Sequence, residues 1–242
     1  MSQITFTEAV RRELAPTGHL RAAINLGNPV LAQGTADQPR GVTVAIAGAL
    51  ADALNSPLDL TCVDAARKSH QAIASGEVDL AFLAIDPARE GAVSFTAPYV
   101  IIEGVYVVRA EAPFTDFSSI DRDGVSIAVR EGSAYDLFLT RALQSATLVR
   151  ADEPTEAFED QNLEVVAGVR QPLAAYVAGT RTRIVEPAFM QIRQAVGLPR
   201  RTSDEASTAV AQFVEELKSS GFIAEELRRS GQNATVAPAS SR

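Results

Sequence analysis

An alternation of short apolar runs with helical patterns, which occurs twice along the chain, constrains the fold most. In the first third, apolar runs at 20–25, 58–62 and 79–84 are separated by helical patterns over 41–54 and 67–75. Parallel strands need a crossover connection, which a helix usually supplies, so this order favours a parallel sheet covered by helices. We predict an α/β unit here, whose second helix stops at Gly76.

The pattern then returns. Apolar runs at 125–129, 147–150 and 163–167 alternate with helical patterns over 133–143 and 155–161, which predicts a second unit with its own core. The apolar run at 99–109 joins the two units and is interrupted at Glu103–Gly104, so we predict a crossing strand with a hinge. Further runs at 183–185 and 189–196, followed by an amphipathic helix, predict that the chain returns to the first unit.

We therefore expect two discontinuously built lobes. Lobe 1 is predicted to comprise residues 1–103 and 190–242, and lobe 2 residues 104–189. A chain of 242 residues has room for two lobes of about 100 residues each. The small, polar tail from Gly231 is expected to fray.

Composition narrows the classes of function. One cysteine, Cys62, and two histidines, His19 and His70, give neither a disulfide framework nor zinc-ligand spacing, and we expect no cofactor or metal. The balance of 22 basic against 30 acidic residues opposes binding to nucleic acid or to an anionic membrane. Apolar stretches stay well below the roughly 18 residues of a membrane span. A small molecule is therefore the expected partner.

The segment at 75–99, SGEVDLAFLAIDPAREGAVSFTAPY, carries several anchors at fixed offsets. It resembles the type II solute-binding proteins of ABC importers, in the polar amino-acid branch, and REGSAY at 130–135 and the stretch 213–227 extend the match over nearly the whole chain. The resemblance implies a two-lobed type II periplasmic-binding-protein fold. Each lobe is then a mostly parallel sheet flanked by helices, and a two-segment hinge joins the lobes, which close on one ligand.

In the family that the chain resembles, an arginine at the Arg89 position binds the ligand carboxylate with two hydrogen bonds. The chemistry supports this, because a planar guanidinium matches two carboxylate oxygens and Arg89 follows a strand at the carboxyl edge of a sheet. The alternative is a surface arginine after the turn at Asp86–Pro87. Backbone N–H groups of Ser133, Ala134 and Tyr135 at a helix start would add an anion site, although Ser133 could simply cap that helix.

Departures from the family pattern bear on the ligand. Arg170, beside Gln171, stands where the family has an acid for the ligand's α-ammonium, and Ala84 stands where a hydroxyl usually helps. An ammonium would then meet repulsion, so we expect an anionic ligand such as a dicarboxylate or keto acid and not a free α-amino acid. The alternative is that Arg170 points outward through a one-residue misalignment.

Other residues could line the site. Asn25 and Asn28 lie in the loop after the first strand, where the family places a pocket wall, but Asn28–Pro29 is also a good turn. Glu103 at the expected hinge could contact ligand or Arg170, or face water. Asp64 and Arg67 follow the second strand and could equally form a solvated helix start.

We predict a substrate-binding protein of an ABC-type importer, a monomer that is not an enzyme, with an ABC permease as its possible partner. The alternatives are a dehydratase-like enzyme with Glu103, then Asp64, as acid or base, and an orphan cytoplasmic ligand-binding protein. The resemblance implies a periplasmic location. Charged residues between Glu8 and Glu13 interrupt any leader, which predicts a cytoplasmic protein if Met1 is native.

Overall fold

The computed structural model describes residues 4–240, which form two compact units. Unit 1 takes the chain as far as Ile101 and again from Arg193 onward, and unit 2 is Ile102–Ile192. The chain therefore passes between the units twice, once within strand β7 (Val100–Arg109) and once within strand β11 (Thr182–Pro199).

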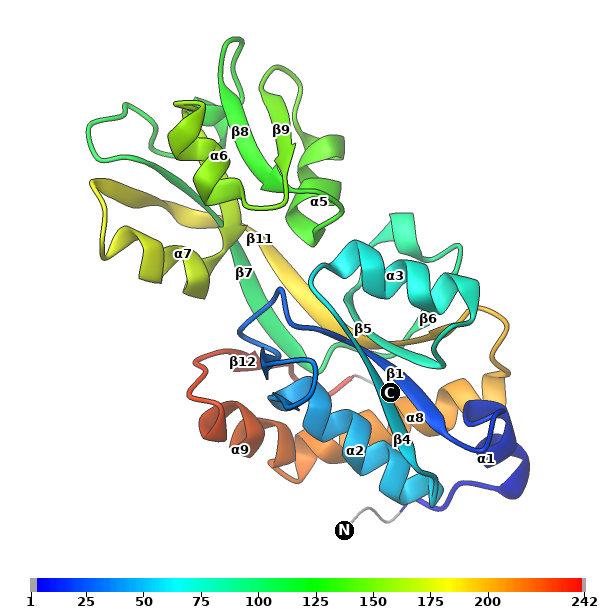
Figure 1. Cartoon of the computed structure of the whole chain (residues 1–242). Coiled ribbons are helices and arrows are strands. Elements are labelled where there is room, and N and C mark those ends of the chain that lie inside the picture. Colours follow the sequence, from blue (N-terminus) through cyan, green and yellow to red (C-terminus); the bar gives the residue numbers. More distant parts are fainter. Residues whose placement is uncertain (1–3, 241–242) are drawn as a thin grey trace. The chain divides into compact units, whose positions relative to one another are not determined.

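Unit 1 is built on a sheet with the strand order β4–β1–β5–β11. Strands β1, β4 and β5 are parallel, and the second half of β11 runs antiparallel to β5. Because β4 and β5 lie on opposite sides of β1, two right-handed crossovers place helices α2 and α3 on opposite faces of this sheet (Figure 1). The strands are β1 (Leu20–Asn25), β4 (Leu58–Val63), β5 (Leu80–Ala84), the short β6 (Val93–Phe95) beside β11, and the β2 (Gln33–Gly34) and β3 (Pro39–Arg40) hairpin.

The helices of unit 1 begin and end where the sequence supplies caps. Thr7 caps the first helix, Ser203 caps the long amphipathic one, and Gly76 ends the third with a left-handed φ of 79°. The helices are α1 (Glu8–Leu14), α2 (Val42–Leu54), α3 (Ala66–Ser75), the 3₁₀ turn η1 (Pro87–Arg89), α8 (Asp204–Ser219) and α9 (Phe222–Arg229).

Unit 2 repeats the plan with the strand order β7–β10–β8–β9. Strands β10, β8 and β9 are parallel, whereas β7 runs antiparallel to β10. The core packs Phe158 and Leu173 against strand residues such as Val105 and Val166. The elements are α4 (Phe117–Ile120), β8 (Ser126–Arg130), α5 (Ala134–Ala142), β9 (Thr147–Ala151), α6 (Pro154–Asp160), β10 (Val165–Val169) and α7 (Arg170–Val177).

Three expectations are corrected. Strand β7 is continuous through Glu103–Gly104, because Gly104 makes room for Met190 and Phe189, whose side chains would lie 2.6 and 3.2 Å from an added Cβ. The predicted strand at 163–167 starts at Val165, since the Leu163 N–H closes a turn on the Phe158 carbonyl at 3.1 Å. The two runs at 183–185 and 189–196 form one strand, β11.

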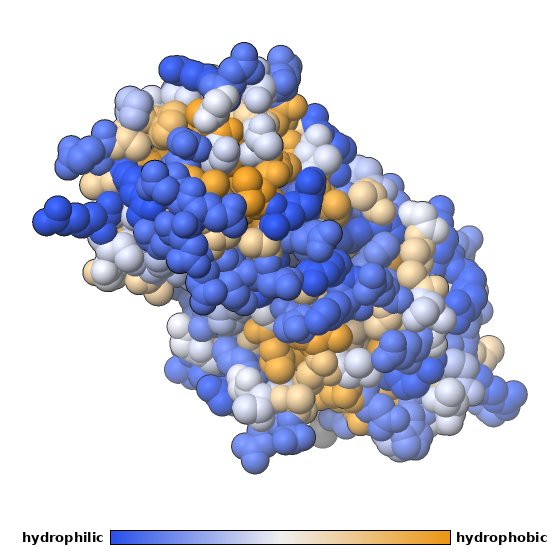
Figure 2. Space-filling view, turned by 45° about the horizontal axis from the view of Figure 1, so that its top comes forward, coloured by the Kyte–Doolittle hydropathy of each residue, from blue (hydrophilic) through white to orange (hydrophobic). Residues whose placement is uncertain are grey.

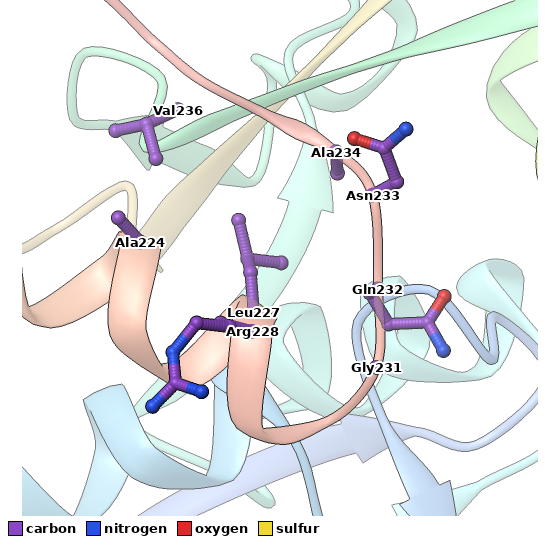
Figure 3. A pocket seen from close by; sticks show the side chains of 8 residues that line it. All are labelled: Ala224, Leu227, Arg228, Gly231, Gln232, Asn233, Ala234 and Val236. Carbon is purple, nitrogen blue, oxygen red and sulfur yellow. The ribbon is translucent and has the colours of Figure 1, made fainter.

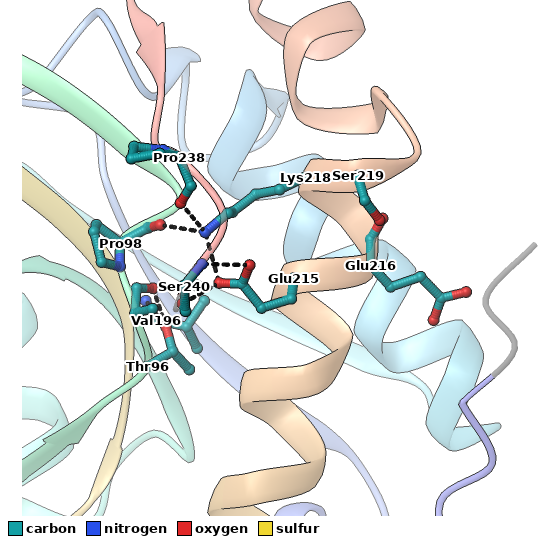
Figure 4. Close-up of polar contacts among 10 residues, drawn as sticks. Thr96, Pro98, Val196, Glu215, Glu216, Lys218, Ser219, Pro238 and Ser240 are labelled. Atoms are coloured by element: carbon teal, nitrogen blue, oxygen red, sulfur yellow. Dashed lines mark hydrogen bonds and ion pairs between the residues drawn. The ribbon is translucent and has the colours of Figure 1, made fainter. Parts of the chain in front are cut away.

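The tail after Gly231 does not fray as expected as far as Ser240, and the last two residues of this prediction, 241–242, lie outside the described residues. Strand β12 (Thr235–Val236) pairs antiparallel with the first two residues of β7, Val100 and Ile101. Lys218 of α8 lies buried beside it and donates hydrogen bonds to the carbonyls of Pro98 and Pro238, at 3.2 and 2.8 Å (Figure 4). Glu215 accepts from Lys218 at 2.6 Å and from the Ser240 hydroxyl at 2.7 Å, so the tail is tied to α8.

The surface fits a chain with a formal charge of −8. On the face seen in Figure 2, hydrophilic residues predominate and apolar residues gather in patches that hydrophilic ones enclose. Within residues 4–240, the structure contains no helix of the length and apolarity that crossing a membrane requires. The same residues contain no group of three or more His, Cys, Asp or Glu side chains arranged to hold a metal ion.

Candidate functional site

The topology brings the predicted residues of unit 1 to one edge of its sheet. Parallel strands end at the same edge, so Asn25 at the end of β1 and Ala84 at the end of β5 are neighbours there, and Arg89 follows β5 by one turn. Ligands of α/β proteins bind at this carboxyl edge.

Arg89 is the most buried charged side chain of this edge. Arg89 is only 2% exposed, and its Nη1 donates a hydrogen bond to the carbonyl of Ala84 at 2.9 Å. The turn that carries it is fixed by Asp86, whose carboxylate accepts from the Ala88 N–H at 2.9 Å. Burial lowers the pKa of Arg89 to about 10, and the nearby charge of Asp86 opposes that shift. The guanidinium is therefore a desolvated cation held in a fixed orientation.

His70 of α3, which sequence reasoning did not assign to the site, lies beside Arg89. The histidine hydrogen-bonds the backbone of Arg89, while burial, followed by the positive charge of Arg89, lowers the pKa of His70. The position of His70 in α3, four residues after Ala66, does not predict this contact. The contact with Arg89 depends on how α3 packs on the sheet.

The two asparagines of this edge shape their own loop. Asn25 accepts a hydrogen bond from the Gly27 N–H at 3.0 Å, and Asn28 accepts from the Val30 N–H at 3.3 Å. These are Asx turns, so the structure contains the turn expected at Asn28–Pro29 and a second, unpredicted one at Asn25. Asp64, two residues before α3, is exposed and forms an ion pair at 2.8 Å with Lys68 in the first turn of that helix. Arg67 lies half-buried one residue before Lys68.

In unit 2, the start of α5 is partly satisfied by its own side chains. Ser133 caps the helix by accepting from the Asp136 N–H at 3.1 Å, as the alternative interpretation expects. The N–H of Gly132 donates to the Asp136 carboxylate at 2.8 Å. The Ser133 N–H donates to the Arg130 carbonyl at 3.1 Å, whereas the N–H groups of Ala134 and Tyr135 have no acceptor within residues 4–240. The predicted anion site is thus reduced to two donors beside the buried carboxylate of Asp136.

Arg170 opens helix α7 directly after β10, with Gln171 half-buried behind it. The Arg170 Nε donates to Glu103, while Nη1 and Nη2 donate to the two oxygens of Glu186 at 2.6 and 2.8 Å. These hydrogen bonds raise the pKa of Arg170, that from Glu186 most, and lower the pKa of Glu186. Of the interpretations left open for Glu103, contact with Arg170 is the one that the structure contains.

This pairing corrects the charge argument. The expectation of a second cation for an anionic ligand left a contact between Glu103 and Arg170 open, and the structure adds Glu186, so two carboxylates of the same unit hold Arg170. Glu186 was missed, because a glutamate 16 residues after Arg170, on another strand, leaves no local pattern. The triad of Glu103, Arg170 and Glu186 carries a net charge of −1.

A surface pocket of about 370 Å³ lies elsewhere in unit 1, between α9 and the loop that leads to β12 (Figure 3). It contains none of the residues that the sequence assigns to a site. Its lining residues are Ala224, Leu227, Arg228, Gly231, Gln232, Asn233, Ala234 and Val236.

The comparisons with known proteins agree on the architecture. The family model of bacterial extracellular solute-binding proteins, family 3, matches residues 20–230. The virulence sensor protein BvgS of Bordetella bronchiseptica is 31% identical over 137 residues, which is 56% of this chain and 11% of that sensor. The chain thus matches only a small part of this relative's length.

Solved structures show the same fold at low identity. A mutant of ArgBP from T. maritima superposes with a TM-score of 0.75 at 19% identity, covering 92% of this chain and 99% of that one. The periplasmic VFT2 domain of Bordetella pertussis BvgS superposes with a TM-score of 0.73 at 22% identity, covering 94% and 99%. These likenesses establish a two-lobed periplasmic-binding-protein fold.

Proposed function

This chain is a member of the bacterial extracellular solute-binding proteins, family 3, and on that premise we propose that it is the substrate-binding component of an ABC-type importer. It closes its two units on a small carboxylate, and Arg89 is the ligand's anchor.

Arg89 is the observation that carries this proposal. A planar guanidinium matches the two oxygens of a carboxylate, and such a charge-assisted pair is stronger where water is excluded. The side chain is 2% exposed, sits one turn beyond β5 at the carboxyl edge, and is oriented by the Ala84 carbonyl.

The ligand class follows from the same edge. Ala84 has no hydroxyl to hold an ammonium, which favours keto or hydroxy acids over free α-amino acids. In unit 2, two carboxylates already hold Arg170, so the proposal requires a single carboxylate on the ligand, for Arg89.

A thermal-shift screen tests the proposal. Purified protein is tested with matched sets in which each α-amino acid stands beside its keto and hydroxy acids, such as L-alanine with pyruvate and lactate, and L-phenylalanine with phenylpyruvate. A ligand at about a hundred times its dissociation constant adds about 2.7 kcal/mol to stability, which raises the melting temperature visibly. Stabilisation by the acids supports the proposal, and a screen in which no carboxylate stabilises the protein contradicts it.

A sensory role is the second candidate, since the curated relative BvgS is a virulence sensor protein. The two roles differ in what the cell loses with the gene. Deletion should abolish uptake of the radiolabelled acid found in the screen if the protein serves an importer. Unchanged uptake with an altered transcriptional response to that acid would instead indicate a ligand-sensing domain.

An enzyme is less well supported. Glu103, the predicted acid or base, has its Oε2 bound to Arg170, and Asp64 pairs with Lys68 on an exposed helix turn. Incubating the protein with the acids that stabilise it, and following them by mass spectrometry, should show no conversion.

A further inference from the structure

His70 and Arg89 are two neighbouring groups of unit 1 that can both carry positive charge. Arg89 lies in the turn η1 after β5 and is 2% exposed, and His70 of α3 hydrogen-bonds its backbone. The Arg89 N–H already donates to the Asp86 carbonyl at 2.9 Å, so the histidine is the donor of this bond and the Arg89 carbonyl accepts it. One ring nitrogen of His70 is thereby engaged.

The other ring nitrogen of His70 makes no hydrogen bond. Its Nε2 atom is buried and is without a hydrogen-bond partner in the part of the chain that the structure describes. A neutral imidazole carries its single N–H on one nitrogen and a lone pair on the other. Because the N–H is directed at the Arg89 carbonyl, the lone pair lies on Nε2, and a proton that binds to the ring adds there.

Burial and charge keep that proton off the ring at neutral pH. Burial lowers the pKa of His70 most, and the positive charge of Arg89 lowers it further. The pKa of Arg89, at about 10, still leaves the arginine charged. The neutral histidine has a cost of its own, because a buried lone pair without a donor has lost its hydration. The protonation of His70 therefore responds to the charge around Arg89.

Arg89 is the charge near His70 that a ligand can offset. Helix α3 packs on β1, β4 and β5, and the other charged groups around it lie in its own first turn, in η1 and at the amino edge of the sheet. They are Arg67, the ion pair of Lys68 with Asp64, Asp86 and the exposed Glu90, and the pairs of Arg21 with Asp79 and of Asp59 with His19 at the amino edge. Of these charged groups, Arg89 is the one whose charge lowers the pKa of His70.

A carboxylate on Arg89 changes the charge that His70 faces. The negative charge of the ligand offsets the positive charge of the arginine, so a proton on His70 becomes less unfavourable. Coupling between two binding events is reciprocal: if the carboxylate favours the proton, the proton favours the carboxylate by the same factor. This coupling lies within unit 1 and depends on no residue of unit 2.

We propose that this site binds its carboxylate together with one proton, which adds to Nε2 of His70. The proton comes from solvent, and no bond of the ligand forms or breaks. The proposal rests on the proposed function, which makes Arg89 the anchor of the ligand. It adds that the acid is held as an anion plus a proton, and more tightly at lower pH.

Calorimetry measures this proton directly. Pyruvate, lactate and phenylpyruvate serve as probes, because the carboxyl groups of such acids ionise at about pH 4 or below and stay anionic in the range tested. Titrations in two buffers with different heats of protonation give the number of protons taken up per ligand. The wild type should take up a fraction of a proton at pH 6.0, and should bind at least about threefold more tightly at pH 5.5 than at pH 8.0.

His70→Gln and His70→Asn are the test variants. Each amide side chain can still donate a hydrogen bond to the Arg89 carbonyl, but neither takes up a proton in this range. Both variants should bind about as tightly as the wild type at pH 8.0, where His70 is neutral. Both should lose the proton uptake at pH 6.0 and the gain in affinity at pH 5.5.

A third measurement needs no variant of His70, and it decides the question if both variants unfold. The chain has two histidines, so His19→Gln identifies the ring C–H signals of His70 in a proton NMR spectrum by removing those of the other histidine. The pKa of His70 followed in this way should rise by about 0.5 or more when a saturating probe acid is added, which corresponds to the threefold gain in affinity.

Three results overturn the inference alone: a wild type that binds the acids without proton uptake, uptake that persists in the folded His70 variants, or a pKa of His70 that a bound acid leaves unchanged. Failure of all three acids to bind the wild type at either pH contradicts the proposed function, and with it this inference.

Discussion

Arg89 in unit 1 and Arg170 in unit 2 occupy equivalent places, each just beyond a strand at the carboxyl edge of a parallel sheet. Arg89 is 2% exposed and is oriented by a backbone carbonyl, whereas the side chain of Arg170 is 27% exposed and is held by two carboxylates. The same residue type in equivalent topological positions is thus almost fully desolvated in one unit and partly exposed between two carboxylates in the other. Partners, and not position alone, decide what an arginine can bind.

The largest expected effect comes from removing the buried arginine. Arg89→Ala should weaken carboxylate binding by at least about 100-fold, or about 2.7 kcal/mol, because both hydrogen bonds to the ligand are lost. Arg89→Lys keeps the positive charge but loses the planar pair of N–H donors that matches a carboxylate, and should weaken binding less than Arg89→Ala does. Calorimetry with the tightest acid of the screen measures both. Arg200→Ala, at an exposed position of the same unit, should bind as the wild type does.

Lys218 allows a test of whether burial of a cationic side chain is enough to identify it as a ligand-binding residue. Its side chain is 4% exposed, like that of a binding residue, yet two carbonyls and Glu215 satisfy it. Lys218→Met should cost about 1–3 kcal/mol of stability, since it leaves buried acceptors without a donor. Urea unfolding measures this loss, and ligand affinity should not change. A drop in affinity as large as that of Arg89→Ala would remove the distinction between the two cations.

Arg170→Gln tests the other half of the comparison, that the arginine of unit 2 is not required for carboxylate binding. Partly exposed ion pairs contribute little, so stability should fall by about 1 kcal/mol, and binding of a monocarboxylate should change by less than about tenfold. The measurements are again urea unfolding and calorimetry. If this substitution abolishes carboxylate binding as Arg89→Ala does, Arg170 is a ligand-binding cation after all.

The smallest effect concerns His70 beside Arg89. Burial and the arginine lower the pKa of His70 in the folded state, so the unfolded chain binds the proton more readily. Stability should therefore fall as the pH drops below about 6.5, the ordinary histidine pKa, and through the lowered value. Urea unfolding of His70→Gln should show a shallower fall over that range.

Local patterns predicted much of the fold. The strands at Leu20–Asn25 and Leu80–Ala84, the helix stop at Gly76 and the cap at Ser133 each follow from neighbouring residues. The continuity of β7 and the ordered tail did not follow, because they depend on packing against β11 residues and on Lys218.

Less of the candidate site could be predicted from the sequence, again because some of its contacts join residues from different elements. Arg89 could be singled out because its strand and turn are contiguous with it. The partners of Arg170 come from β7 and β11, which are distant in sequence, and their carboxylates change the sign of the local charge. The sequence gives the charge of a residue, but which opposite charges pair with that residue depends on the tertiary structure.

The most direct test is a crystal structure of the protein with the tightest-binding acid of the thermal-shift screen. The account predicts the ligand carboxylate on the Arg89 guanidinium, with two nitrogen–oxygen distances of about 2.7–2.9 Å, while Arg170 keeps its hydrogen bonds to Glu103 and Glu186. A carboxylate bound to Arg170, with Glu186 displaced and Arg89 not in contact with the ligand, would contradict it.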